Sequence, residues 1–355
     1  MIMFERKFTR QINVGGVKVG GGAPISIQSM TNTKTHDTPA TVEQINRLAE
    51  AGCDLVRVAV PDINAAKNLG AIISAVDVPI VADIHFDYKL ALESIAQGVA
   101  ALRLNPGNIG GAAHVREVVK SARAAKIPIR IGVNAGSLSR KLLQKYGGPT
   151  PEALVESALD HVAILEAEDF FDIKISLKAH DVPLTLAAYR LMSAKKNYPL
   201  HLGITEAGTV NTGVIKSAVG IGALLAEGIG DTIRVSLTGD PLVEVKVAAE
   251  ILKSLGLRDG GATLIACPTC GRTRIDLPKI AAQVEEKIST VKKNLTVAVM
   301  GCVVNGPGEA RTADVGIAGA DGEGIIFRKG VIVRKVPESE LVAELFAEID
   351  KILAE

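Results

Sequence analysis

Two kinds of hydrophobic pattern alternate along most of the chain: short apolar runs and segments with helical periodicity. Short runs of Val, Ile and Leu recur between positions 25 and 255, and each is followed by a segment with the apolar spacing of an amphipathic helix. Strands that alternate with helices are typical of a parallel sheet. The predicted strands are 24–29, 54–59, 79–83, 101–104, 128–133, 172–176, 200–204 and 232–236.

Eight such units fit a (β/α)8 TIM barrel, which typically needs about 250 residues. A doubly wound open sheet is the alternative fold for the same alternation. Residues 11–23, with glycines at 15, 16 and 20–22, predict a hairpin before the first strand. Because no helix follows these glycines directly, we interpret them as turn residues and not as a phosphate-binding loop.

The alternation ends in a glycine-rich segment at residues 256–262, which predicts a domain boundary. We therefore expect a barrel domain over residues 1–258 and a small α/β domain over residues 259–355. The second domain is predicted to hold strands at 263–266 and 295–300, a helix over 277–290, three further strands near 315, 325 and 333, and a closing helix from 338.

The charge balance excludes some classes of function. The 355 residues include 40 Lys and Arg against 39 Asp and Glu, a formal net charge of +1. This balance lacks the excess positive charge typical of nucleic-acid binding, so any anion site must be local. The sequence holds no run of about twenty apolar residues, and its start lacks the apolar core of a secretion signal. We therefore expect a cytoplasmic protein.

Three of the four cysteines lie in the second domain, beside predicted strands. Cys267 and Cys270 have Cys-x-x-Cys spacing, which serves zinc, iron–sulfur clusters and redox disulfides alike, and Cys302 follows the strand at 295–300. No second pair of zinc ligands follows Cys302, so we favour an iron–sulfur cluster over zinc. Glu309 is the candidate fourth ligand, although a glutamate there is ordinarily a solvated residue at a helix start. We interpret Cys53 as a small buried hydrophobe.

Polar residues near the ends of the predicted barrel strands recur with period two, so they share one face. In a barrel this face points inward, and active sites lie at the carboxyl ends of the strands. An internal ion pair explains any one charge there, but the cations outnumber the two nearby acids, Asp83 and Glu206. This surplus predicts a multiply charged anion, and bidentate arginines favour a diphosphate. The cations are Arg57, Arg103, Arg130, Lys174 and Arg234, and the neutral candidates are His85, Asn105, Asn134 and Ser236.

Glu206 follows the seventh predicted strand, in a segment with glycines at 203 and 208. We expect burial to raise its carboxyl pKa, which suits a general acid, in preference to a role in neutralising an arginine. His85 lies at the end of the third strand. Its side chain is a candidate for proton transfer or for packing alone, and the sequence favours neither role over the other.

Six ordered motifs resemble those of the bacterial 4-hydroxy-3-methylbut-2-en-1-yl diphosphate synthase family, in its compact two-domain form. The resemblance runs essentially end to end. The motifs are SIQSMTNT at 26–33, RLNPGN at 103–108, RIGVN at 130–134, GITEAG at 203–208, CPTCGR at 267–272 and NGPGE at 305–309.

The resemblance implies a barrel similar to dihydropteroate synthase and a [4Fe-4S] cluster on Cys267, Cys270, Cys302 and Glu309. It implies as substrate 2-C-methyl-D-erythritol 2,4-cyclodiphosphate, whose ring is opened with loss of water by two electrons from a flavodoxin or ferredoxin, in the non-mevalonate isoprenoid pathway. It also implies homodimers in which the cluster domain of one chain faces the barrel of the other.

The resemblance assigns roles to residues of the barrel as well. Glu206 matches the family's proton donor. The proposed diphosphate contacts match Arg57, Arg103, Arg130 and Lys174, and the pocket includes Asn134 and Ser236. Two other classes of function remain open: an iron–sulfur electron carrier would not need the barrel cations, and a pterin-type barrel transferase would not need the cluster.

Overall fold

The computed structural model describes residues 5–291, 293–303, 308 and 310–355. The chain divides into two compact units, Met1–Arg258 and Asp259–Glu355, which are described one at a time. Within the described residues, no helix is both long enough and apolar enough to span a membrane.

Eight parallel strands form the first unit's sheet, in the order β8-β7-β6-β5-β4-β3-β10-β9. A bridge between Ile175 in β8 and Leu200 beside β9 joins the two ends of this order. The predicted TIM barrel is therefore confirmed, and each observed strand overlaps a predicted one. The strands are β3 (Ser26–Met30), β4 (Leu55–Ala59), β5 (Ile80–Asp83), β6 (Ala101–Arg103), β7 (Ile129–Asn134), β8 (Ile173–Lys178), β9 (His201–Leu202) and β10 (Thr232–Ile233).

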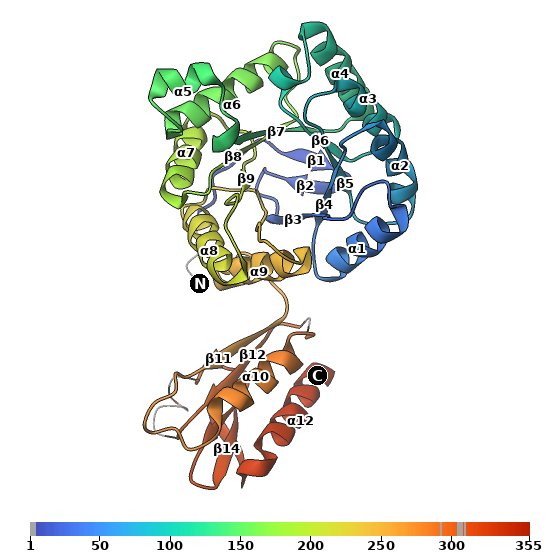
Figure 1. Ribbon diagram of the computed structural model, residues 1–355. Helices are drawn as coiled ribbons and strands as arrows, with labels where there is room; N and C mark the ends of the chain where they lie inside the picture. Colours follow the sequence, from blue (N-terminus) through green and yellow to red (C-terminus); the bar gives the residue numbers. More distant parts are fainter. Residues whose placement is uncertain (1–4, 292, 304–307, 309) are drawn as a thin grey trace. The chain divides into compact units, whose positions relative to one another are not determined.

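Helices form a ring around the strands (Figure 1). Several begin at an aspartate whose carboxylate accepts a hydrogen bond from a backbone N–H of the first turn: Asp37, Asp62, Asp87, Asp181 and Asp240. The helices are α1 (Thr38–Glu50), α2 (Ile63–Ser74), α3 (Tyr88–Ala96), α4 (Ala112–Ala125), α5 (Arg140–Tyr146), α6 (Pro151–Glu166), α7 (Val182–Lys195), α8 (Val210–Ala226) and α9 (Pro241–Ser254), with short 3-10 turns at Pro106–Asn108 and Ala135–Ser137.

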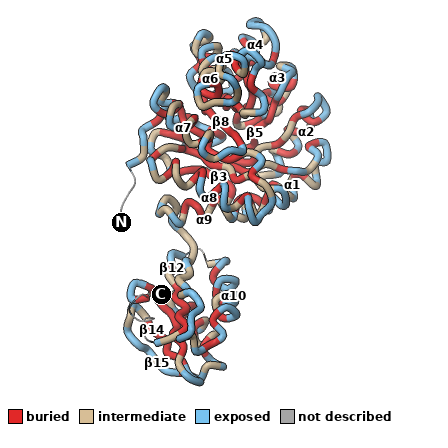
Figure 2. The backbone as a smooth tube through the Cα atoms, turned by 60° about the vertical axis from the view of Figure 1, so that its left-hand side comes forward, coloured by how far each residue is buried: buried red, intermediate tan, exposed pale blue. Residues whose placement is uncertain are grey.

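The main apolar core lies between the strands and this ring of helices. Outward-facing strand residues such as Ile27, Leu102 and Ile131 are fully buried against helix residues such as Leu48 and Leu69. Buried residues run continuously along the strands in Figure 2, whereas the outer helix faces are exposed. Because the apolar residues of the strands face outward, the inward positions are free to carry charge.

The amino ends of the strands are covered by an antiparallel hairpin of β1 (Ile12–Val14) and β2 (Val17–Val19). The turn between them uses Gly15 and Gly16, both at positive φ. The predicted hairpin is therefore confirmed, and it plugs this end of the barrel with an apolar layer. The buried members of this layer are Ile12, Val14, Val19, Leu55, Val81 and Ala101.

The second unit is a five-stranded sheet in the order β11-β12-β13-β14-β15, with its first three strands parallel and the others antiparallel. Helices α10 and α12 share one apolar core with the sheet. A second, smaller cluster includes Met300, Phe327 and part of Cys267. The elements are β11 (Ala262–Ala266), α10 (Leu277–Ile288), β12 (Leu295–Met300), β13 (Val315–Gly319), β14 (Glu323–Arg328), β15 (Val331–Pro337), a 3-10 turn (Glu338–Glu340) and α12 (Leu341–Ala354).

Candidate active site

A row of charged residues crosses four neighbouring barrel strands. Asp83, Arg103, Arg130 and Lys174 are register partners across β5, β6, β7 and β8. Asp83 and Arg103 are the last residues of their strands, whereas Lys174 is the second residue of β8. The row therefore begins at the carboxyl ends of the strands, here called the barrel mouth, and descends into the interior.

Asp83 is the centre of an ion-pair cluster at the mouth. Its carboxylate lies 3.3 Å from Arg103 Nη1, 3.9 Å from Arg57 Nε and 3.3 Å from His85 Nε2. Burial opposes the ionisation of Asp83, but Arg57, the hydrogen bond from His85 and Arg103 together hold its pKa well below the usual value. Burial also lowers the pKa of Arg57 to about 10, against the attraction of Asp83. Asp83 is therefore an anchor for cations.

Gly132 allows Arg103 to cross the neighbouring strand. A Cβ atom at position 132 would lie 2.6 Å from Arg103 Nε, which is closer than packed atoms approach. The Gly132 carbonyl accepts hydrogen bonds from Arg103 Nη2 and Asn105 Nδ2, each at 3.0 Å, and its N–H donates to Asn105 Oδ1 at 2.9 Å. Asn105 therefore clamps the backbone of β7 and fixes the guanidinium of Arg103.

Glu244, a residue that the sequence analysis missed, is the second buried acid near the mouth. It lies on α9, and its carboxylate is 3.7 Å from Arg234 Nη2. It also accepts hydrogen bonds from the Leu237 N–H at 2.9 Å and the Ser29 hydroxyl at 3.3 Å. The second acid that partly balances the inward cations is therefore Glu244, whereas the sequence analysis expected Glu206.

Lys178 is a further inward cation that the sequence analysis missed. It is the last residue of β8, is 6% exposed, and faces Asn134 across the register. Burial first, and then Arg234, Arg130 and Arg57, hold its pKa well below the usual value. The period-two pattern of Lys174, Ser176 and Lys178 would have revealed it if the predicted strand had continued beyond residue 176.

Glu206 is exposed, so the expected burial of its carboxylate is not found in the chain as described. It lies in the loop after β9 with a φ of 52°, a left-handed conformation that non-glycine residues rarely adopt. This loop holds the carboxylate at the surface. His85 is also mostly exposed, whereas Asn134, the last residue of β7, and Ser236, three residues beyond β10, are half-buried.

Several nitrogen atoms of the inward cations are buried without a hydrogen-bond partner in the described part of the chain. These atoms are Arg103 Nε, Arg130 Nε and Nη1, Arg234 Nε and Lys174 Nζ. Nearly all buried polar groups in folded proteins are satisfied, so each unsatisfied donor needs a partner. An anion with several oxygens would supply acceptors and neutralise the surplus charge at once.

The cysteine thiols of the second unit lie at adjacent strand ends. Cys267 follows β11, and its Sγ accepts a hydrogen bond from the Gly301 N–H at 3.2 Å. The turn that carries Cys270 is tied to the same segment, because the Arg274 N–H donates to the Gly301 carbonyl at 2.9 Å. Cys302 is the next residue. Hydrogen bonds from the Arg272 backbone and then its side chain lower the pKa of Cys270, which favours the thiolate.

The donor chemistry of this segment fits an iron–sulfur group, because three free thiols follow two adjacent strands, and backbone N–H groups donate to Cys267 and Cys270. Glu309, the predicted fourth ligand, lies outside the described residues. Among those described, no three His, Cys, Asp or Glu residues already surround a common metal position. Cys53 is buried and burial raises its pKa to about 12, in agreement with its predicted structural role.

Family comparisons agree over nearly the whole chain. Residues 9–249 match the family model described as the GcpE TIM-barrel domain, and residues 263–351 match the GcpE protein C-terminal domain. A 4-hydroxy-3-methylbut-2-en-1-yl diphosphate synthase (flavodoxin) of Geobacter sulfurreducens is 63% identical over 347 residues, with 98% of each chain covered. Its counterpart in Clostridium perfringens is 62% identical over 348 residues, covering 98% of this chain and 100% of that protein.

Solved structures with low sequence identity agree on the barrel fold alone. Dihydropteroate synthase of Yersinia pestis has a TM-score of 0.50 at 13% identity, covering 69% of this chain and 97% of that one. The enzyme of Xanthomonas albilineans gives the same TM-score, identity and coverage. With two matching domain models and full-length relatives of such high identity, the chain belongs to the GcpE family.

Proposed function

We propose that this chain is a 4-hydroxy-3-methylbut-2-en-1-yl diphosphate synthase that opens the ring of 2-C-methyl-D-erythritol 2,4-cyclodiphosphate reductively. The product would be (E)-4-hydroxy-3-methylbut-2-en-1-yl diphosphate, with one hydroxyl lost as water. The observation that carries the proposal is the set of buried, unpartnered guanidinium donors of Arg103, Arg130 and Arg234 inside the barrel. The names of the full-length relatives support the same reaction.

The barrel cations would hold the diphosphate throughout the reaction. Arg57 and Arg103 are fixed by Asp83, so their remaining donors can bind phosphate oxygens without further ordering. Arg130 and Lys178 would add positive charge from β7 and β8. Arg234, which follows β10 and pairs with Glu244, would add a further positive charge. The pocket thus stabilises the negative charge that develops on the phosphate leaving group when the ring opens.

The thiolates of Cys267, Cys270 and Cys302, with Glu309 as fourth ligand, would hold a [4Fe-4S] cluster. Bound there, this group supplies single electrons and a Lewis-acidic iron. The protein's own contribution is twofold: hydrogen bonds from Arg272 lower the pKa of Cys270, and the Gly301 N–H donates to Cys267 Sγ. A flavodoxin would deliver the electrons, as the names of the relatives suggest.

Glu206 would donate the proton that accompanies loss of the hydroxyl. Its exposure gives it access to protons from water, and its φ of 52° is the kind of strained backbone conformation that clusters at functional sites. We expect Glu206→Gln to lower kcat by about 100-fold, the lower range for loss of general acid catalysis. Iron and sulfide content, and the affinity for the cyclic diphosphate, should stay at the native level. A kcat within a factor of about two of the native value would contradict the role.

We propose a homodimer in which the cluster unit of one chain serves the barrel of the other. Ile215 and Val219, one turn apart on α8, expose 64% and 55% of their surface, an apolar patch that a second copy would cover.

A mixed dimer of one Cys302→Ala chain and one Glu206→Gln chain should recover activity that neither variant has alone, because one active site then receives both intact residues. Absence of recovery in a purified mixed dimer would contradict the cross-chain arrangement.

The function itself is tested by turnover of the cyclodiphosphate with an artificial one-electron reductant under anaerobic conditions. The protein should be brown, contain iron and acid-labile sulfide, and release the hydroxybutenyl diphosphate. Colourless protein that contains zinc, or coloured protein that leaves the cyclic diphosphate unchanged, would overturn the proposal.

A further inference from the structure

Lys174 occupies the deep end of the charged row that begins at Asp83. It faces Arg130 across the register and lies four residues before Lys178, the cation at the mouth end of the same strand. One inward position of β8, Ser176, therefore lies between Lys174 and the mouth. At this depth Lys174 belongs to the interior beneath the anion site and is poorly placed for direct contact with it.

The amine of Lys174 is isolated from counter-charge. Lys174 is 3% exposed, and its Nζ is buried without a hydrogen-bond partner among the residues described. The acid whose charge acts on Lys174 is Asp231, but its carboxylate already accepts hydrogen bonds from the Thr9 hydroxyl and the Leu200 N–H, each at 2.9 Å. Asp231 also faces Arg6 at 3.5 Å. Its charge is therefore largely used at the amino end of the barrel.

The other charged groups near Lys174 repel a proton. Arg130 on β7 faces Lys174 across the register and disfavours its protonation, whereas Asp231 favours it. His201 on β9 is fully buried, with Nδ1 2.5 Å from the Thr232 hydroxyl and Nε2 without a partner in the same described set. Burial, and then Arg130, Lys178 and Lys174, hold the pKa of His201 well below the usual value, so it stays neutral.

An ammonium ion without a counter-ion is costly in such a place, whereas a neutral amine is not. Burial, followed by repulsion from Arg130, lowers the pKa of Lys174 to about 7. A dianion bound at the mouth beside Arg130 would reverse the local balance of charge. It would attract a proton to Lys174, the buried amine whose Nζ has no hydrogen-bond partner among the described residues.

We propose that Lys174 is a neutral amine in the free protein and takes up one proton from solvent when the cyclic diphosphate binds at the mouth. Substrate binding is then coupled to proton uptake, and Lys174 is a charge-compensating residue that supports Arg130 from below. This inference rests on the proposed function, since it takes the diphosphate as the anion. No bond of the substrate changes in the step: one solvated proton moves to Nζ.

The protonation of Lys174 in the free protein and in the complex determines how the affinity for the diphosphate changes with pH. If the pKa is about 7 when free and higher in the complex, binding takes up a proton at any pH between those two values. The affinity for the diphosphate should then fall up to about tenfold for each unit of pH above neutrality. Below about pH 6 the amine is already protonated in both states, so the uptake should vanish there.

Titration calorimetry of the oxidised holoenzyme with the cyclodiphosphate, in two buffers of different ionisation enthalpy, measures the uptake directly. Each phosphorus of this ligand carries a single, strongly acidic hydroxyl, so the ligand itself gains no proton near neutrality. We expect an uptake approaching one proton at about pH 8 in the native protein. The Lys174→Met variant should bind the ligand with no uptake and with an affinity that does not vary over this pH range.

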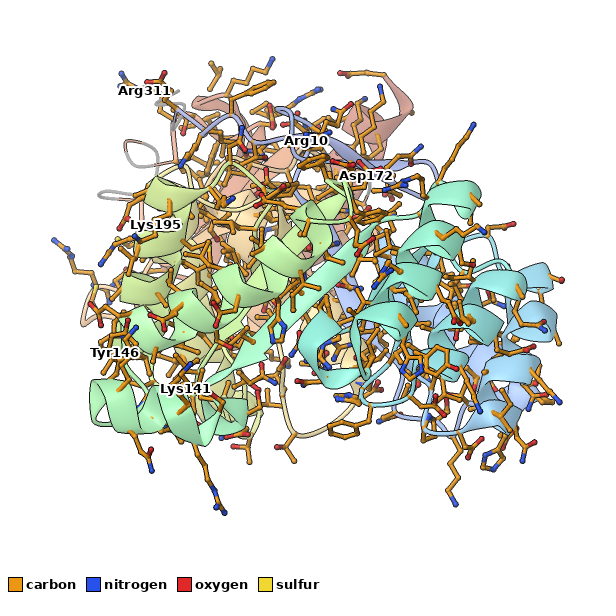
Figure 3. The ribbon with its side chains drawn as sticks, turned by 90° about the horizontal axis from the view of Figure 1, so that it is seen from above. Arg10, Lys141, Tyr146, Asp172, Lys195 and Arg311 are labelled. Carbon is orange, nitrogen blue, oxygen red and sulfur yellow. The ribbon has the colours of Figure 1, made fainter. Side chains whose placement is uncertain are left out.

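Lys195 provides the matched control. It lies exposed on the outside of the barrel at the end of α7, as Figure 3 shows, and the Lys195→Met variant should retain the native uptake. Unchanged uptake in Lys174→Met would overturn the inference, and so would loss of uptake in His201→Asn together with its retention in Lys174→Met.

If Lys174→Met fails to fold, the native protein still gives a test. An uptake at about pH 8 close to zero, or an affinity independent of pH, would overturn the inference without any variant. Failure of the native holoenzyme to bind the cyclodiphosphate at all would instead count against the proposed function. The two failures are therefore distinguishable in one titration.

Discussion

Replacing Cys302 with alanine should abolish turnover of the cyclic diphosphate while the barrel continues to bind anions. Cys302 follows Gly301, the residue whose N–H and carbonyl tie together the segments of Cys267 and Cys270. Removal of one thiolate from an iron–sulfur site leaves an iron without a strong ligand, and the cluster is lost. The barrel cations belong to the other unit, which has its own core.

The measurements are visible absorbance, iron and sulfide analysis, and calorimetric titration with inorganic pyrophosphate. The Cys302→Ala variant should be colourless and bind pyrophosphate like the native protein. Cys53→Ala is the matched control, because Cys53 is a buried barrel thiol that donates to the Leu55 carbonyl at 3.1 Å. The control should keep its colour, iron and activity. A coloured, active Cys302→Ala protein would contradict the cluster assignment.

Replacing Asp83 with alanine should lower the free energy of unfolding of the barrel by about 3–5 kcal/mol, the usual cost of leaving buried partners of an ion pair without their counter-charge. Asp83 is 6% exposed and is the acid shared by Arg57, Arg103 and His85. The folded pKa of Asp83 lies well below its unfolded value, so its stabilisation is present above the unfolded pKa. The stabilisation is lost only as the pH falls through the low folded pKa.

Urea unfolding at neutral pH measures the change. The control is Glu227→Ala, which removes the same charge from an exposed pair with Arg190 and should cost at most about 1 kcal/mol. Added pyrophosphate should restore part of the stability of Asp83→Ala, because the anion replaces the lost counter-charge. A loss in Asp83→Ala no larger than that of the control would show that the cations at the mouth do not depend on this carboxylate.

The barrel was predictable because eight short apolar runs alternate with segments of amphipathic helical spacing between positions 25 and 255. The boundary of β8 was harder: the predicted strand ended at residue 176, and Lys178 was missed although it continues the alternation begun at Lys174. Strand ends depend on pairing with neighbours, which no local pattern contains. The inward direction of the polar residues, by contrast, followed from periodicity alone.

The acids at the mouth show where sequence reasoning fails for a physical reason. Glu244 lies in the first turn of α9, where a glutamate is normally solvated and favourable to the helix dipole. Only the three-dimensional packing of α9 against β3 brings it to Ser29 and Arg234. Glu206 was expected to be buried because glycines flank it, but the fold of its loop leaves it exposed. Burial of a loop residue is a tertiary property.

The hairpin at the amino end of the barrel places an apolar layer beneath the charged interior. Val14 and Val19 in this layer are fully buried and pack with Leu55, Val81 and Ala101, near the starts of β4, β5 and β6. Among the described residues, the layer separates the charged interior from the amino end. We therefore expect an anionic substrate and its product to enter and leave the barrel through the mouth.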